Sequence, residues 1–116
     1  MQPTPRFIQG VFSFEGKGLE FPCPLAPAAG HAVANDKRGQ MVYLRAGNAS
    51  DELVYLVLTR STKPMRYFPI GPKQSVHVPL AVVEDIFPES RLEILIGAPL
   101  GLKGSIVLDC GLLEVD

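Results

Sequence analysis

Short apolar runs separated by turn residues form the dominant pattern of this chain. Runs rich in Val, Ile, Leu, Phe and Tyr recur roughly every 8–12 residues, with glycine or proline between them, which is typical of antiparallel β proteins. This pattern predicts an all-β fold, a small antiparallel β-sandwich or jelly-roll-like barrel of about eight strands. At most one short helix is expected, over 81–87, because that run ends before Pro88. The main expected strands are 6–14, 40–46, 53–60, 65–70, 75–80, 91–96, 105–110 and 112–115.

The spacing of these runs also predicts how some of them pair. The segments 40–46 and 53–60 are expected to form a hairpin, with Asn48 as a residue of the turn between them. The two glycines in 15–18 suit a second tight turn, because glycine tolerates positive φ. Gly111 is expected to separate the last two strands. No repeat of fixed period is visible.

The segment 53–60 is apolar on both of its faces. One face carries Tyr55 and Val57, and the other carries Val54, Leu56 and Leu58. A half-exposed strand would show polar residues on one side, so this strand is expected to be covered on both. Two covers are weighed equally: a loop of the same chain, or another subunit.

The segment 21–35 contains no Asp, Glu, Lys or Arg, and proline recurs in its first half. It is predicted to be an extended Pro-rich arm or loop of a single domain spanning 1–116, since proline favours an extended path. Such an arm either lies on its own sandwich or crosses to a neighbouring copy. Together with the apolar loop 97–102, it supplies most of the candidate interface residues, which are Phe21, Pro22, Cys23, Pro24, Leu25, Pro27, Tyr55, Val57, Leu100 and Leu102.

Composition narrows the function classes. The chain has 116 residues, 47% of them hydrophobic and 20% charged, with a net charge of −1. One domain is expected, and the charge gives no reason to expect nucleic acid as a partner. No apolar run is long enough for a membrane span, and the first residues lack the pattern of a signal peptide. The expected location is therefore a virion or the cytoplasm, with Cys23 and Cys110 as free thiols.

Catalytic and metal-binding alternatives are weighed and placed lower. Cys23 and His31 could form a nucleophile–base pair, and the same two residues with His77 and Cys110 could ligate a metal, but neither spacing matches a known motif. The acidic pairs Glu84–Asp85 and Glu89–Glu93 are interpreted as solvated residues. A basic group around two turns, interleaved with Tyr67 and Phe68, is the best nucleic-acid candidate, and it comprises Arg60, Lys63, Arg66 and Lys73. No cofactor is expected.

The region 40–80 loosely resembles half of an immunoglobulin-like or jelly-roll domain. The residues that carry this resemblance are "MVYLRAGNASDELVYLVLTR" and "FPIGPKQSVHVPL". The resemblance concerns the fold pattern and transfers no functional residues.

The features together favour a non-enzymatic structural or assembly protein that forms homo-oligomeric contacts. A small viral capsid, decoration or cement protein, with a capsid shell as a larger scaffold, is the specific version of this hypothesis. The alternative is a β-sandwich binding or accessory module that holds a partner protein or small ligand with Tyr43, Tyr55, Tyr67 and the basic turns. A thiol enzyme built on Cys23 is a third hypothesis.

Overall fold

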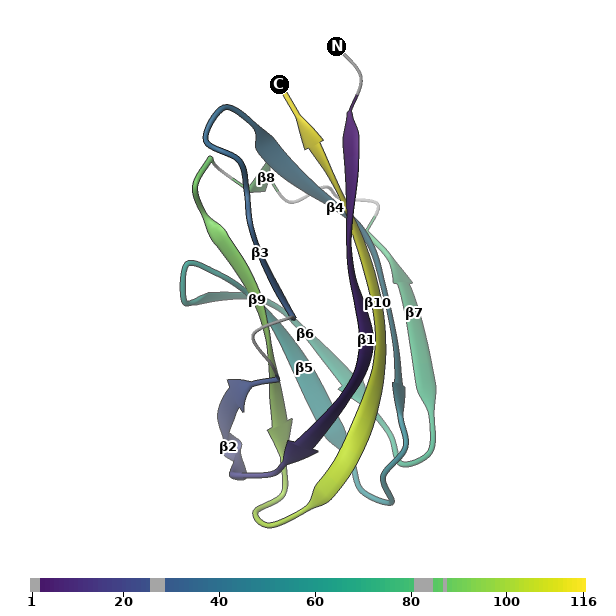
Figure 1. The fold of residues 1–116 in the computed structure, drawn as a ribbon. Coiled ribbons are helices and arrows are strands. Elements are labelled where there is room, and N and C mark those ends of the chain that lie inside the picture. Colours follow the sequence, from purple (N-terminus) through teal and green to yellow (C-terminus); the bar gives the residue numbers. More distant parts are fainter. Residues whose placement is uncertain (1–2, 26–28, 81–84, 87) are drawn as a thin grey trace.

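A computed structural model of the chain describes residues 3–25, 29–80, 85–86 and 88–116. These residues form two antiparallel β-sheets packed face to face, so the predicted β-sandwich is confirmed (Figure 1). No helix occurs in the described residues. Of the possible helix at 81–87, Asp85–Ile86 forms a short strand instead, and the other positions lie outside the described residues.

Each sheet contains five strands. Sheet A has the order β1-β10-β4-β7, with β8 beside β4, and sheet B has the order β2-β9-β5-β6, with β3 beside β9. The strands are β1 (Thr4–Glu15), β2 (Gly18–Pro24), β3 (Gly30–Ala32), β4 (Arg38–Asn48), β5 (Val54–Arg60), β6 (Lys63–Ile70), β7 (Ser75–Pro79), β8 (Asp85–Ile86), β9 (Arg91–Ala98) and β10 (Lys103–Val115).

The core lies between the sheets and follows the alternation expected of strands. In β5, Val54, Leu56 and Leu58 point into the core, while Tyr55 points outward. The large side chains that are fully buried are Met41, Leu44, Leu56, Leu58, Ile70, Leu92, Ile94, Ile96, Ile106, Leu108 and Leu112. The most deeply buried part of the core is therefore free of aromatic rings, with Phe12, Phe14 and Phe68 packed around it, and most of the polar side chains lie on the outer faces and at the ends.

The predicted hairpin of 40–46 with 53–60 is wrong. β4 pairs with β10, β7 and β8 in sheet A, whereas β5 pairs with β6 and β9 in sheet B. The connection crosses between the sheets because the buried Asn48 anchors it there. Its amide nitrogen donates to the carbonyls of Glu52 (2.8 Å), Ile70 (3.2 Å) and Gly71 (3.1 Å).

The described strands of the segment 21–35 lie against their own sandwich rather than extending from it, and residues 26–28 lie outside the described residues. Cys23 pairs with Ile96 and His31 with Leu92, so β2 and β3 follow one another along β9. The predicted break at Gly111 is also wrong, because β10 runs through it with a register shift between Gly111 and Leu112.

The buried carboxylate of Glu114 ties the β3–β4 connection to sheet A. It accepts hydrogen bonds from Arg6 Nε (2.8 Å) and the Ala34 N–H (3.0 Å), and its other contact is His31 Nε2 (3.2 Å). Burial alone would raise the pKa of Glu114, but these hydrogen bonds outweigh burial and hold the pKa at about 2.

Candidate binding surfaces

The outer face of sheet A carries a polar row that crosses four strands. The register places Gln9 opposite Asp109, Asp109 opposite Arg45, and Arg45 opposite His77. We call these four residues, together with Tyr43, the polar row. Because alternate residues of a strand share one face, the register alone brings together residues from β1, β10, β4 and β7.

Asp109 is the acceptor at the centre of the polar row. Its Oδ1 accepts from Gln9 Nε2 (2.9 Å) and from the Tyr43 hydroxyl (2.8 Å), and its Oδ2 accepts from Arg45. The hydrogen bonds from Gln9, Arg45 and Tyr43 lower the pKa of Asp109. Burial, and then the bond to Asp109, raises the pKa of Tyr43. The carboxylate is therefore held ionised in a fixed orientation.

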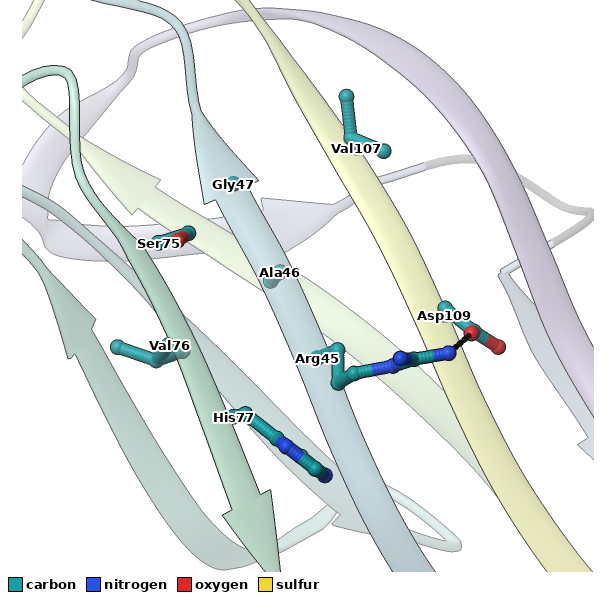
Figure 2. Close-up of a pocket in the computed structure, with 8 residues that line it drawn as sticks. All are labelled: Arg45, Ala46, Gly47, Ser75, Val76, His77, Val107 and Asp109. Atoms are coloured by element: carbon teal, nitrogen blue, oxygen red, sulfur yellow. Dashed lines mark hydrogen bonds and ion pairs between the residues drawn. The ribbon is translucent and has the colours of Figure 1, made fainter.

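A shallow, open depression of about 550 Å³ lies beside this row (Figure 2). Figure 2 shows Arg45 reaching across from β4 to Asp109, with His77 on β7 at the lower left and Val107 on β10 at the top. Gly47 forms part of the floor, and a Cβ there would meet only Ser75 (3.9 Å) and Val107 (4.0 Å). The depression combines charged, aromatic and apolar groups, which is the usual composition of a small-ligand surface.

The outer face of sheet B is built differently. Tyr55 lies across Gly97 of the neighbouring β9, and its hydroxyl donates to the carbonyl of Leu19 on β2 (2.6 Å). Val57 and Thr59 on the same face are about 1% exposed. Val57 stands between Tyr67 and Leu95 in the register. The middle of this face is therefore covered by residues of the same chain. Of the two covers weighed for β5, the same chain or another subunit, the structure supports the same chain there.

Exposed apolar side chains gather where β2 meets the loop 99–102. Leu19, Phe21 and Leu100 are 44%, 66% and 81% exposed, and with Pro99 they line a depression of about 360 Å³. We call these four residues the apolar corner. Two backbone hydrogen bonds hold the loop in place, from Gly16 N to Leu102 O (2.7 Å) and from Gly101 N to Gly16 O (2.9 Å).

The candidate interface residues differ in how exposed they are in the structure. Phe21, Pro22, Pro24 and Leu100 are exposed, whereas Cys23, Tyr55 and Leu102 are partly buried. Leu25 and Val57 are buried within the chain, so they offer no surface to a partner and leave the candidate interface. Pro27 lies outside the described residues.

The candidate catalytic and metal-binding residues are not brought together. Cys23 and His31 pair with β9 residues four positions apart, which corresponds to about 13 Å along a strand. His77 lies on the outer face of sheet A, while Cys110 is buried in the core, where burial raises the pKa of its thiol to about 12. Within the described ranges, no three His, Cys, Asp or Glu side chains are grouped as metal ligands are.

The predicted basic group is also divided. Arg60 and Lys63 lie at the β5–β6 turn, whereas Lys73 lies beyond the other end of β6, where it donates to the Ala49 carbonyl (2.9 Å). Phe68 is buried in the core and only Tyr67 is exposed. Of the acidic candidates, Glu84 lies outside the described residues and Asp85 lies in β8. Glu93 lies on the outer side of β9, with its carbonyl accepting from Thr59. In the part of the chain that the structure describes, nothing helical reaches the length and hydropathy of a membrane span.

Reasoning from the sequence missed Gln9, Arg45 and Asp109. Each one alternates with core residues, so its outward direction was visible in the sequence. Their proximity was not visible, because the bonded pairs Arg45–Asp109 and Gln9–Asp109 are 64 and 100 residues apart.

Comparison with known proteins gives a likeness of fold. No protein-family model and no curated protein matches the sequence. Among solved structures, the chain resembles the CBM36-1 domain of a multidomain xylanase from the hindgut metagenome of Trinervitermes trinervoides, with a TM-score of 0.54 and 11% identity over 90% of this chain and 95% of that chain.

A second similar structure comes from infectious bursal disease virus, Gt strain. The TM-score is 0.54 and the identity 14% over 98% of this chain, which spans 32% of the viral chain. At these identities, both likenesses establish the β-sandwich and nothing about partners.

Proposed function

We propose that the protein is a non-enzymatic assembly protein that works as a homo-oligomer, with the apolar corner as a contact surface. The observation that carries this proposal is the exposure of Phe21 and Leu100 around one apolar depression. Exposed apolar side chains are ordinary when scattered, but a contiguous group of them marks an interaction site. The hydrogen-bonded loop presents Leu100 on a fixed backbone, which reduces the entropy lost on association.

In its most specific form, the proposal is a virion protein of the capsid, decoration or cement type. The likeness to a chain of a virus structure supports this form at the level of the fold. The β-sandwich also suits it, because rigid sheets position exposed side chains for repeated contacts. A larger scaffold such as a capsid shell is then the natural partner.

The test is the native mass, measured by light scattering after gel filtration over a concentration series. We expect an oligomer that Leu100→Asp dissociates, with affinity weakened at least about tenfold by loss of a buried leucine. Val107→Asp, at another exposed apolar site, on sheet A, is the control and should leave the mass unchanged. A wild-type monomer at every concentration contradicts the proposal. Point substitutions are used because deleting 22–30 would remove parts of two paired strands.

A second candidate function is a ligand-binding module on the outer face of sheet A. The observation that favours it is the 550 Å³ depression beside the polar row, where Arg45, His77 and Asp109 offer hydrogen-bonding groups. The likeness to a CBM36-1 domain suggests a saccharide as the ligand class.

Filling the depression tests this candidate. Gly47→Val should keep the fold, because a Cβ at Gly47 meets only ordinary contacts, while its methyl groups occupy the floor. Affinity electrophoresis in gels containing soluble xylan, or other neutral polysaccharides, should show retarded wild-type protein and unretarded Gly47→Val. Equal mobility of both proteins in every gel contradicts the candidate.

A further inference from the structure

The edges of the two sheets are protected unequally. A free edge strand exposes unpaired backbone groups, and natural proteins protect such edges with proline, short length or charge. β6 contains Pro64 and Pro69, and β2 contains Pro22 and Pro24. β7 has five residues and ends at Pro79, with the two-residue β8 further along the same edge of β4. Three of the four edges therefore carry a feature that discourages further pairing.

The remaining edge is β1, and it lacks such protection over most of its length. β1 has 12 residues, pairs with β10 throughout, and forms the end of sheet A. After Pro5, the stretch from Arg6 to Glu15 contains no proline and no lysine. Among the described residues, no other strand is paired with its free side (Figure 1). Long unprotected edges are ready templates for another strand.

We propose that β1 pairs antiparallel with β1 of a second copy, about a two-fold axis perpendicular to the sheet, so that the two A sheets become one continuous sheet. This pairing rests on the self-association proposed above. It adds the β1 edge as a contact surface distinct from the apolar corner. An isologous contact of this kind uses the same surface on both copies and closes as a dimer.

The sequence of β1 suits pairing with itself. The run from Phe7 to Phe14 is uncharged, so no like charges meet in the middle of the paired strands. Of the two charged ends, Arg6 is already bonded to the Glu114 carboxylate, while Glu15 is exposed. The antiparallel direction follows from the two-fold axis perpendicular to the sheet, which relates two copies of one strand in opposite directions.

The outward side chains of β1 point to the same arrangement. Phe7 and Val11 are 57% and 70% exposed, although they lie on a strand that is paired with β10 along its whole length. Cross-strand partners on a neighbouring β1 would cover the sides of both residues that face away from β10. Aromatic and β-branched residues gain most from such cross-strand contacts.

Cysteine cross-linking tests the pairing directly. Single cysteines are placed at the outward positions Phe7, Gln9, Val11 and Ser13 in a Cys23→Ala background, and Ser75→Cys on the opposite edge is the control. Each variant, and each equimolar mixture of two variants, is oxidised and separated by non-reducing electrophoresis. We expect covalent dimers only from the positions or mixtures that one antiparallel register opposes, because opposed residues of paired strands lie at disulfide distance.

A charge at the edge gives a second, independent readout. Val11→Lys places two lysines near each other in the paired strands, and we expect the dimer to weaken about tenfold by light scattering. Val107→Lys makes the same change on the same face, opposite Val11 but one strand inside the edge, and should leave the dimer intact. If Val107→Lys weakens it equally, copies meet through the sheet face and the edge pairing is wrong.

The outcomes separate this pairing from the proposed function. An oligomer without cross-linking above the Ser75→Cys control overturns the β1 pairing and leaves self-association through another surface. A wild-type monomer with no cross-linking overturns both. Cross-linking at β1, together with a native mass that Leu100→Asp leaves unchanged in the protein without added cysteines, supports the β1 pairing and removes the apolar corner from the contact.

Discussion

The outer faces of the two sheets share one arrangement of side chains, and it has a different role on each face. On each face a tyrosine lies across a glycine of the neighbouring strand, Tyr43 over Gly111 in sheet A and Tyr55 over Gly97 in sheet B. The hydroxyl of Tyr43 then donates to a charged side chain, that of Asp109. The hydroxyl of Tyr55 donates to a backbone carbonyl on β2.

The difference shows how the environment of a side chain decides its role. Tyr55 spans β9 and ties the edge strand β2 to β5, so its contribution is to the assembly of the sheet. Tyr43 stays on an open polar face, where it fixes the carboxylate that Arg45 also binds, with the Arg45 guanidinium 5.4 Å from its ring centre. Sheet A thus presents an organised polar surface, and sheet B presents a tied edge with an apolar corner.

The largest expected effect comes from the two glycines. A Cβ at Gly97 would lie 2.2 Å from the Tyr55 ring, and a Cβ at Gly111 would lie 2.3 Å from the Tyr43 ring. Each tyrosine must then move away and lose its ring contact and its hydroxyl bond. Gly97→Ala and Gly111→Ala should each lower the free energy of unfolding by about 1–3 kcal/mol, measured by urea denaturation.

Gly47→Ala is the matched control for both glycine substitutions. Its Cβ meets nothing closer than 3.9 Å, so the free energy of unfolding should change by at most about 0.5 kcal/mol. Equal losses at Gly47 and Gly97 would mean that general strand flexibility, rather than the tyrosine, accounts for the effect.

Acid should affect sheet A before sheet B. Among the described residues, the carboxylates whose pKa is lowered are Asp109 and Glu114, and both lie on β10. A carboxylate with a lowered pKa contributes stability that is present above its ordinary pKa and is lost as the pH falls through the folded value. For Glu114 this window runs from 4.5 down to about 2.

Hydrogen exchange of β10 and β4 amides, compared with β5 and β9 amides, checks this expectation between pH 6 and pH 3. Protection in sheet A should fall first. Glu114→Gln should flatten the pH dependence and lower the free energy of unfolding at pH 7 by about 1–3 kcal/mol, because charged hydrogen bonds are lost. A parallel loss of protection in both sheets would indicate one cooperative unit and contradict the distinction.

Sequence patterns predicted the parts of this fold that depend on the alternation of neighbouring residues along a strand. The alternation of Val76, His77 and Val78 indicates that the valines and the histidine point to opposite sides, and the structure places the valines against the core and His77 outside. Phe21 and Leu100, both candidate interface residues, are exposed in the structure, and their part in an interface stays a prediction.

Strand order depends on contacts between residues far apart in the sequence, which the alternation along a single strand does not show. The hairpin expected between β4 and β5 was wrong because the buried Asn48 amide satisfies three carbonyls at the crossing between the sheets, a role that looks like an ordinary turn in sequence. The polar row was missed for the same reason. Gln9, Arg45 and Asp109 lie on three strands, and only the pairing of β1, β10 and β4 makes them neighbours.

The smallest expected effect distinguishes the two tyrosines themselves. Tyr55→Phe removes a hydroxyl that is bonded to a backbone carbonyl and leaves the Leu19 carbonyl without that donor, so we expect a loss of about 1 kcal/mol in the free energy of unfolding. Tyr43→Phe leaves Asp109 with Gln9 and Arg45, and water can replace the missing donor on this open face, so the loss should be less than about 0.5 kcal/mol. Urea denaturation of the two variants under identical conditions makes the comparison. A larger loss for Tyr43→Phe would mean that the hydroxyl bond of Tyr43 within the polar row stabilises the fold more than the bond of Tyr55 to β2 does.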